Sequence, residues 1–419
     1  MWRRFLKKPA LFFEILRKKS NREVIMSKIR FADRMNNIPF SPSLAIIKRI
    51  RELRQKGVEI INFGTREDTP TNAKSAVIQY LKKEAASAYT DTRGTPELRE
   101  AIAYKLKADN GLVVDPDTEI VAAVGGKQGV LSALLTLVDQ GDEVLLEDPG
   151  WLSFEPMVRM VGATPIPIPI FEENGFKLDV DDLRKRITPN SRVLVLCDPH
   201  NPTGRMLDRS DLQTIAEFVQ QHDLLVIMDE AYERFTYDGQ KHVSMASLEG
   251  MWERTISIQS ASKIYNMYGW RVGWVVADKI FLEKIQAINS HSITCPTSFA
   301  QAGVAEALRN SMGFGDISIA QLMQNHQLQR DTLVNGLRSI PGVTCELPMG
   351  AFFAFPNFKK FDLNSEELST YLLENAGVAT WAGSFFGDQG EGYLRLVFNS
   401  PIPEIELGVE KMAKSLSEL

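Results

Sequence analysis

Hydrophobic positions along this chain follow two alternating patterns, one typical of helices and one typical of strands. Between Ser43 and Lys56 an apolar residue recurs about every three positions among charged neighbours, which predicts an amphipathic helix. The apolar run Val58–Phe63 then predicts a strand. Further strands are expected at Glu119–Val124, Glu143–Leu146, Thr164–Pro169, Arg192–Cys197, Leu224–Met228 and Thr255–Ile258, and helices at Gly126–Val138, Trp151–Met160 and Asp208–Gln221. Strands that alternate with helices predict an α/β fold with a mostly parallel sheet.

The pattern changes after about Pro296. Two longer helices are expected at Ser298–Arg309 and Ile319–Leu337, followed by short strands around Gly350–Phe355 and Gly392–Phe398. This order predicts a second, smaller α+β unit. Because no repeat or long linker separates the two parts, we expect closely packed domains with a ligand pocket between them.

The first 20 residues differ in charge from the rest of the chain, since seven are basic and only Glu14 is acidic. The apolar run Pro9–Phe13 is too short for a transmembrane helix or a secretory signal, so we expect no membrane span. We interpret residues 1–25 as an appended extension, with the globular pattern starting at Met26. A basic amphipathic helix that contacts a membrane or acts as a transit peptide is the alternative interpretation.

The composition narrows the class of function. With 419 residues, 44% hydrophobic and 24% charged, the chain has ample apolar material for a large globular core. A net charge of −5 argues against a nucleic-acid-binding surface and favours small-molecule chemistry. The cysteines Cys197, Cys295 and Cys345 are odd in number and far apart, and they lack the spacing of a metal site. We therefore expect three core thiols, no bound metal and a reducing, cytoplasmic compartment.

The most informative segment is Ser260–Gly273, which has a hydroxyl three residues before Lys263 and a guanidinium, Arg271, eight residues after it. A lysine amine can form a Schiff base with an aldehyde cofactor, and hydroxyl and guanidinium donors suit that cofactor's phosphate. This is the layout expected for a lysine that binds pyridoxal phosphate. Because a lone lysine is far more often a solvated surface charge, other segments have to supply the pocket.

Further candidate residues follow the expected strands, where open parallel sheets bind ligands. The glycine turn Val124–Gln128 allows backbone N–H groups and a helix N-terminus to approach a phosphate, although most such glycine pairs are simple turns. The ring of Trp151 could cover a flat pyridine or belong to the core. The amide of Asn201 could bond a phenolate oxygen or form only an Asx turn.

Two charged residues stand in apolar surroundings that require a partner. Asp229 follows the apolar strand Leu224–Met228, and a buried carboxylate there needs a cation. A pyridinium nitrogen fits, because Asp229 would keep it protonated and the ring electron-poor; a helix cap is the alternative. Arg395 lies in the apolar strand pattern Tyr393–Val397 and suits a carboxylate, either a substrate's or that of a structural salt bridge.

Together, these segments resemble the fold-type I aminotransferases, near the aspartate and aromatic aminotransferase branch, from about Ile38 to the C-terminus. The most specific segments are Asn201–Gly204, Asp229–Tyr232, Ser260–Lys263 with Gly269–Arg271, and Ala88–Gly94 followed by Leu98–Ile102. The resemblance implies a large domain with a mostly parallel mixed sheet flanked by helices, and a smaller α+β domain built from both chain ends. We expect the large domain at residues 73–297 and the smaller one at residues 26–72 and 298–419.

The resemblance also implies the cofactor pyridoxal 5′-phosphate, a homodimer, and roles for individual residues. The expected catalytic residues are Lys263 as Schiff-base lysine and base, Asp229 at the pyridine nitrogen and Tyr232 at the ring oxygen. The residues expected to contact the cofactor are Gly126, Lys127, Trp151, Asn201, Asp229, Tyr232, Ser260, Lys263, Arg271 and, across the dimer interface, Tyr89. The residues expected to contact the substrate are Gly64, Trp151, Asn201 and Arg395.

The implied reaction moves an amino group from an L-amino acid to a 2-oxo acid such as 2-oxoglutarate. Arg66 and Lys127 are candidates for binding a distal carboxylate, which favours an acidic amino acid over an aromatic one. The segment Gly64–Asp68 departs from the usual Gly-x-Pro-Asp-Phe, so the loop over the substrate is expected to differ in shape. The alternatives are a lyase, decarboxylase or synthase of the same fold, and a ligand-binding homologue without activity.

Overall fold

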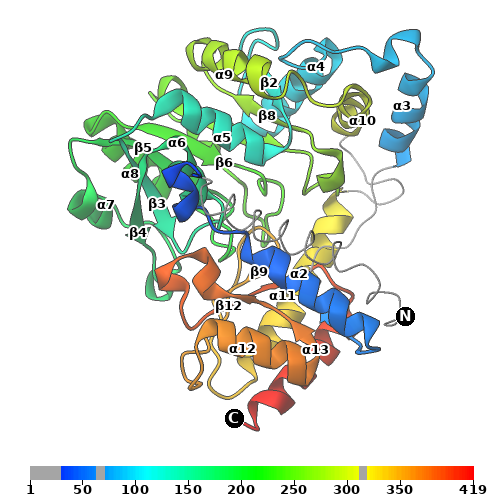
Figure 1. The fold of residues 1–419 in the computed structure, drawn as a ribbon, viewed down its shortest axis with the longest axis vertical. Helices are drawn as coiled ribbons and strands as arrows, with labels where there is room; N and C mark the ends of the chain where they lie inside the picture. The colour runs from blue at the N-terminus through cyan, green and yellow to red at the C-terminus, as the bar shows by residue number, and fades with distance from the viewer. Residues whose placement is uncertain (1–29, 63–70, 311–318) are drawn as a thin grey trace, which may run out of the picture. The chain divides into compact units, whose positions relative to one another are not determined.

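The structure is a computed structural model that describes residues 30–62, 71–310 and 319–419 (Figure 1). Its contacts divide the chain into two units, Met1–Pro39 and Phe40–Leu419. Within the described part of the first unit there is a short 3₁₀ helix, η2 (Asp33–Asn37). The predictions for residues 1–25, for Gly64 and for Arg66 lie outside the described residues.

A seven-stranded sheet lies in the second unit. Its strands are β2 (Ile120–Ala123), β3 (Glu143–Asp148), β4 (Thr164–Pro169), β5 (Ser191–Cys197), β6 (Leu225–Asp229), β7 (Thr255–Ser260) and β8 (Gly273–Val276). Their spatial order is β2-β8-β7-β6-β5-β3-β4, and all run in one direction except β8, which is antiparallel to both neighbours. This mostly parallel sheet confirms the predicted α/β fold.

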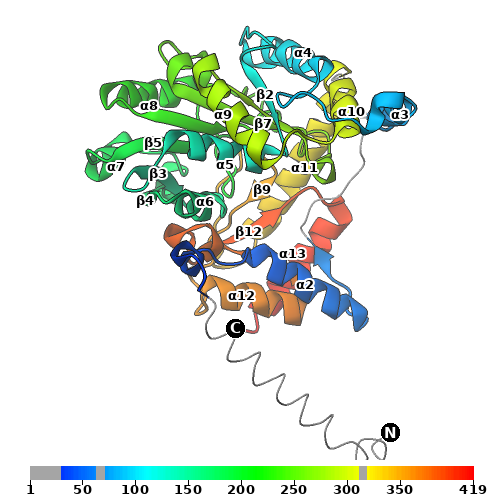
Figure 2. The ribbon, with the colours of Figure 1, turned by 45° about the horizontal axis from the view of Figure 1, so that its top comes forward.

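Helices cover both faces of this sheet, and the alternation of side chains along each strand decides which residues they contact. Val193 and Val195 of β5 belong to the same core as α5 (Gly126–Leu137). Leu194, between them, belongs to a second core with α8 (Arg209–Gln221). Figure 2 shows α5 and α8 on either side of the sheet. The other helices of this part are α3 (Thr71–Leu81), α4 (Pro96–Lys105), α6 (Phe154–Val161), α7 (Val180–Arg186), α9 (Lys279–Ser292) and α10 (Ser298–Arg309).

A smaller α+β part combines the two ends of the second unit (Figure 1). β1 (Ile61–Asn62) pairs in parallel with β10 (Val378–Ala379). β11 (Trp381–Ala382), β12 (Leu394–Val397) and β9 (Phe353–Ala354) form an antiparallel sheet. Ile50 and Leu53 of α2 (Pro42–Gln55) share a core with Leu373 and Ala379, so segments more than 300 residues apart pack together. Its other helices are α11 (Ile319–Arg338), α12 (Ser365–Tyr371) and α13 (Ile402–Leu416).

Some elements differ from the sequence-based expectation. Of the run Val58–Phe63, only Ile61–Asn62 forms a strand within the described residues. Helix α6 begins at Phe154 rather than Trp151, because the residues after β3 form a turn. Strand β8 was not expected, because it is only four residues long and begins at Gly273, the last residue of the segment around Lys263.

The three cysteines differ in burial. Cys197 and Cys345 are buried, whereas Cys295 is only partly buried, so the expectation of three core thiols is wrong for Cys295. Across residues 30–62, 71–310 and 319–419, no helix combines the length and the apolar character needed to cross a bilayer.

Candidate active site

Residues that follow separate strands meet at one edge of the large sheet. In its register Asp229, the last residue of β6, lies beside Cys197, the last residue of β5. Ser260, the last residue of β7, lies beside Gly273, the first residue of antiparallel β8. Because β8 starts where its neighbours end, the segment before it, with Arg271, reaches the same edge.

A cavity of about 180 Å³ lies at this edge. It is lined by nine residues predicted for the site: Gly126, Lys127, Trp151, Asn201, Asp229, Tyr232, Ser260, Lys263 and Arg271. Ala231, Ser262 and Tyr268 also line it and were not anticipated. Ser262 could have been found from the sequence, because this hydroxyl residue immediately precedes Lys263. In the structure its Oγ accepts a hydrogen bond from Ser260 Oγ at 2.7 Å.

The amine of Lys263 lies close to two aromatic rings. Its Nζ is 5.6 Å from the ring centroid of Tyr232 and 5.7 Å from that of Phe352. Burial, reinforced by the positive charge of Arg395 and opposed by Asp229, lowers the pKa of Lys263 to about 8. At neutral pH a larger fraction of this amine is therefore unprotonated than in an ordinary lysine, as a nucleophile or base requires.

Asp229 presents a buried carboxylate to the cavity. The residue is 8% exposed, and its Oδ1 accepts a hydrogen bond from the backbone N–H of Ala231 at 3.1 Å. Burial raises the pKa of Asp229 to about 6, so the carboxylate is mostly ionised at neutral pH. Within the described part of the chain it caps no helix and forms no salt bridge. This arrangement suits a cationic ligand group.

Asn201 connects Tyr232 with Arg395. Its Nδ2 donates to Tyr232 Oη at 3.5 Å, and its Oδ1 accepts from Arg395 Nη1 at 2.9 Å. Tyr232 is buried, and burial raises the pKa of its phenol well above the usual value, so the phenol stays protonated and can donate a hydrogen bond. The two side chains therefore present an amide and a phenol to the same cavity.

A cluster of hydrogen-bond donors suits a phosphate. Gly125, immediately before α5, has a φ of 73°, and a Cβ there would lie 2.5 Å from Arg271 Nη2. Only glycine therefore allows the guanidinium to lie against the N-terminus of the helix. Arg271 also donates to the carbonyl oxygens of Tyr268 at 2.8 Å and Val124 at 3.2 Å, which fixes its orientation. A helix N-terminus, a guanidinium and the hydroxyls of Ser260 and Ser262 together favour a dianion.

Arg395 is a partly buried cation surrounded by aromatic rings. Its guanidinium carbon is 4.6 Å from the ring centroid of Phe353, 5.4 Å from that of Trp381 and 4.7 Å from that of Phe386. Burial lowers its pKa to about 10, which still leaves it charged at neutral pH. Its Nε is buried without a hydrogen-bond partner, and no carboxylate of the described residues forms a salt bridge with it. The structural salt bridge considered from the sequence is therefore absent from this part of the chain, and a ligand carboxylate fits instead.

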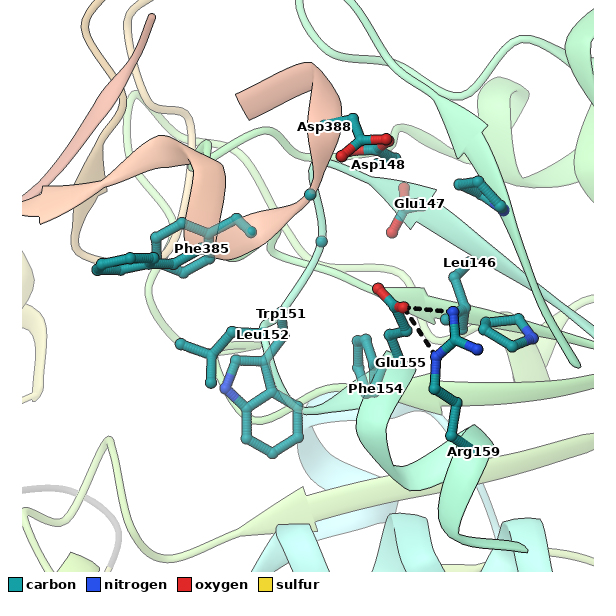
Figure 3. Close-up of a pocket in the computed structure, with 15 residues that line it drawn as sticks. Leu146, Glu147, Asp148, Trp151, Leu152, Phe154, Glu155, Arg159, Phe385 and Asp388 are labelled. Carbon is teal, nitrogen blue, oxygen red and sulfur yellow. Dashed lines mark hydrogen bonds and ion pairs between the residues drawn. The ribbon is translucent and has the colours of Figure 1, made fainter. Parts of the chain in front are cut away.

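Trp151 lines both this cavity and a second one of about 260 Å³ (Figure 3). The second cavity lies between the turn after β3 and the segment Phe385–Asp388. Gly150 N donates a hydrogen bond across it to Phe386 O at 2.7 Å, and nearby Gln389 N, the next residue after Asp388, donates to Asp148 Oδ1 at the end of β3 at 3.1 Å. The turn that carries Trp151 is thus connected to the aromatic residues around Arg395.

Tyr89 does not line this cavity. Its side chain is 86% exposed, in the loop that follows the 3₁₀ helix Glu84–Ser87. Arg395 does not line the cavity either, but it reaches the cavity through Asn201.

Comparison with known proteins identifies similar chains. The sequence model for "Aminotransferase class I and II" matches residues 58–412. The aromatic-amino-acid aminotransferase 2 of Thermococcus litoralis and the aspartate aminotransferase of Pyrococcus abyssi are each 38% identical to this chain, over 89% of it and 95% of the relative. The structure of the Thermus thermophilus aspartate aminotransferase with maleate superimposes with a TM-score of 0.86 at 30% identity, covering 92% of this chain and all of the other.

Proposed function

Because this chain belongs to the class I and II aminotransferase family, we propose that it binds pyridoxal 5′-phosphate in the cavity that contains Lys263. Its activity is the transfer of an amino group between an amino acid and a 2-oxo acid. We further propose that the preferred amino donor is acidic and that the enzyme is a homodimer. The observation that carries the proposal is the convergence of an amine, a carboxylate and an anion-binding cluster on one cavity.

The described residues fit this cofactor. The N-terminus of α5, Ser260, Ser262 and Arg271 would hold its phosphate, and Asn201 and Tyr232 its ring oxygen. Asp229, a buried carboxylate without a salt bridge in the described chain, would hold the protonated ring nitrogen. When bound, pyridoxal phosphate supplies an aldehyde that reacts with amines and a ring that withdraws electrons from the substrate Cα.

Three residues have separate roles in proton transfer, substrate binding and the exclusion of water. Lys263, with its pKa lowered to about 8, supplies a neutral amine that can accept the proton of the substrate Cα and return it to another atom. Arg395, held by Asn201, binds the α-carboxylate and orients the amino acid. Trp151, at the wall between the two cavities, excludes water from one face of the site.

The preference for an acidic donor rests on Lys127. Its Nζ donates to Ser153 Oγ at 3.1 Å and lies 5.0 Å from the ring centroid of Trp151, and no carboxylate of the described residues pairs with it. Burial, and then the charge of Arg271, lower the pKa of Lys127, which means that both disfavour its charged form. A substrate carboxylate beside the amine would stabilise that charged form. The similar Thermus enzyme was solved with maleate, a dicarboxylate, which supports an acidic donor here.

The homodimer rests on Tyr89. A phenol that is 86% exposed and does not line the cavity of its own chain is available to a second copy of the chain. Its hydroxyl would then add a donor to the phosphate cluster of the partner protomer.

The test of the proposed function is an absorbance experiment on the purified protein loaded with pyridoxal phosphate. Glutamate or aspartate should change the visible absorbance of the bound cofactor, and 2-oxoglutarate should reverse the change. The Lys263→Ala variant should bind some cofactor but show no turnover. Cofactor absorbance that no amino acid alters, or release of ammonia or carbon dioxide, would contradict transamination, as would Lys263→Ala activity above a few per cent of wild type.

A further inference from the structure

His242 lies between two buried carboxylates that come from different strand ends. Its Nδ1 is 3.3 Å from Asp198 Oδ2, and its Nε2 is 3.3 Å from Glu230 Oε1. The side chain of His242 is 5% exposed, and those of Asp198 and Glu230 are fully buried. Nε2 makes a hydrogen bond with Glu230, whereas Nδ1 and Asp198 Oδ2 have no hydrogen-bond partner among the described residues and face each other as an ion pair. A charged imidazole in this position therefore interacts with two negative charges.

The surroundings require this imidazole to be charged. Glu230 also accepts hydrogen bonds from Ser244 Oγ at 2.6 Å and Gln259 Nε2 at 2.9 Å, but neither donor carries a charge. Arg205, the other cation near Asp198, is 3.8 Å away and makes its closer contact, 2.7 Å, with Glu147. Burial opposes a charge on His242, but its contacts with Asp198 and Glu230 outweigh burial and raise its pKa to about 10. His242 is therefore a cation shared by two carboxylates at neutral pH.

A metal ion is a weaker explanation of this cluster. Ligand atoms of Glu230, Glu233 and His242 lie within 4.8 Å of one another. However, the carboxylate of Glu233 accepts hydrogen bonds from Lys105 and from Asn110 Nδ2, the latter at 2.7 Å. Protein donors thus already occupy the oxygens of Glu233, one of the three residues that would have to bind the metal.

The two carboxylates belong to the segments that carry the site. Asp198 opens the loop that contains Asn201, and Glu230 directly follows Asp229, two residues before Tyr232. The segments join at the sheet, where Asp198 N donates to Asp229 O at 3.1 Å. They meet again in the cavity, where Asn201 bonds Tyr232. His242 adds a third connection on the buried side.

We propose that His242 is a positioning residue, whose cation bridges Asp198 and Glu230 and thereby fixes Asn201 relative to Asp229 and Tyr232. Without the bridge, two buried carboxylates would lose their shared cation, and the loop with Asn201 would shift away from the segment with Asp229. The groups that bind the ring oxygen and the ring nitrogen would then no longer be held at a fixed separation. This inference rests on the proposed cofactor site, which the wild-type absorbance experiment tests independently.

The experiment uses the cofactor-loaded enzyme and its His242→Gln variant. The pH midpoint at which the visible absorbance of the bound cofactor titrates should move by at least about 0.5 unit, a threefold change in proton affinity. The value of kcat/KM should fall about 10-fold or more, since a small misplacement of catalytic groups is expensive. Ser244→Ala is the matched control, because it removes another bond to Glu230 and leaves the contact with Asp198 in place. It should lower Tm without moving the midpoint.

A second variant changes Asp198, the partner of His242 in the same ion pair. Asp198→Asn keeps an oxygen for the backbone N–H of Leu207, which now donates to Asp198 Oδ1 at 2.9 Å, but it removes the charge that faces His242. It should move the midpoint in the same direction as His242→Gln, and the double variant should move it no further, because both changes break one interaction. A lower Tm with an unchanged midpoint in these variants would overturn the proposal. If His242→Gln does not fold, the midpoint of Asp198→Asn is the deciding measurement. A wild-type enzyme whose cofactor absorbance no amino acid alters would instead refute the proposed function.

Discussion

Arg395 donates a hydrogen bond from Nη1 to Oδ1 of Asn201 across 2.9 Å, although 194 positions separate the two residues in the chain. Arg395 comes from the small antiparallel sheet and Asn201 from the loop after β5. The same amide bonds Tyr232 through its nitrogen. The group proposed to bind the substrate and the group proposed to bind the cofactor therefore share one side chain, so we expect a change at Arg395 to affect both binding and rate.

Replacing Arg395 with lysine should lower kcat/KM for aspartate about 10- to 100-fold, as expected when a hydrogen bond to a charged group, about 1.5–3 kcal/mol, is lost. Lysine keeps the charge but not the planar fork that can bind Asn201 and a carboxylate together. Steady-state kinetics measure the effect. Arg338→Lys is the control, because Arg338 donates to the Cys345 carbonyl outside the site and should leave kcat/KM unchanged. An Arg395→Lys enzyme with wild-type kcat/KM would rule out the assigned role.

The amine of Lys127 should decide between acidic and aromatic donors. Lys127→Gln should raise KM for aspartate about 10-fold, the lower end of the loss expected for a hydrogen bond to a charged group, and change KM for tyrosine little. The ratio of kcat/KM for the two donors is the measurement. Lys359→Gln is the matched control, since the Lys359 Nζ also lies over an aromatic ring, 4.6 Å from the centroid of Tyr393, but outside the cavity. Equal losses for both donors would contradict a specific role for Lys127.

The lowered pKa of Lys263 predicts how the protein without cofactor takes up pyridoxal phosphate. Reaction with the aldehyde requires the neutral amine, so the rate should rise about 10-fold per pH unit below pH 8 and level off above it. An unshifted lysine would titrate near 10.5 instead. Stopped-flow absorbance follows the uptake, and Lys263→Ala should show none of the covalent phase. A rate that still rises steeply between pH 9 and 10 would mean that burial does not lower this pKa.

The exposed position of Tyr89 predicts complementation between two defective variants. Tyr89→Ala should weaken cofactor binding about 10-fold or more if the hydroxyl bonds the phosphate. When Tyr89→Ala and Lys263→Ala subunits are mixed and exchanged, each hybrid dimer should contain one site with both residues intact. Activity at limiting cofactor should then exceed that of either parent. If Tyr89 served its own protomer, no hybrid site would be complete and activity would not recover.

The sequence predicted which residues line the cavity better than it predicted the bonds between them. Lys263, Asp229 and Asn201 could be identified because each follows an apolar strand, and parallel strands end at a common edge. Ser262 and Tyr268 were missed because Ser260, Lys263 and Arg271, in the same short segment, already supplied the groups expected there.

The contacts between distant segments could not be derived from spacing. The bond between Arg395 and Asn201 depends on how the small sheet packs against the loop after β5. Arg271 reaches the cavity through a left-handed backbone, with a φ of 58°, that leads into the unexpected antiparallel strand β8. Nothing in a local pattern of apolar residues indicates such a backbone at an arginine.

Asp148 is expected to make the stability of the folded protein depend on pH. Its Oδ1 accepts a hydrogen bond from Gln389 N at 3.1 Å, and it lines the cavity shown in Figure 3 together with Glu155 and Asp388. Burial, with the charges of Asp388 and Glu155 acting in the same direction, raises its pKa from 3.8 to about 6. The folded protein therefore binds this proton more tightly than the unfolded chain does. Protonated Asp148 therefore adds to the free energy of unfolding at low pH, and this contribution is lost as the pH rises from about 4 through 6.

Asp148→Asn should reverse this loss, because an amide oxygen can still accept from Gln389 but carries no charge to desolvate. The Tm of the variant minus that of the wild type should increase between pH 4.5 and pH 7.5, by about 1–3 °C for a chain of this size. Differential scanning fluorimetry at matched ionic strength measures it, and Asp139→Asn, at an exposed turn, should show no such trend. A difference that stays constant with pH would mean that Asp148 is solvated in the folded protein. The bond to Gln389 would then, like other exposed pairs, contribute little to holding the turn with Trp151 against the residues that surround Arg395.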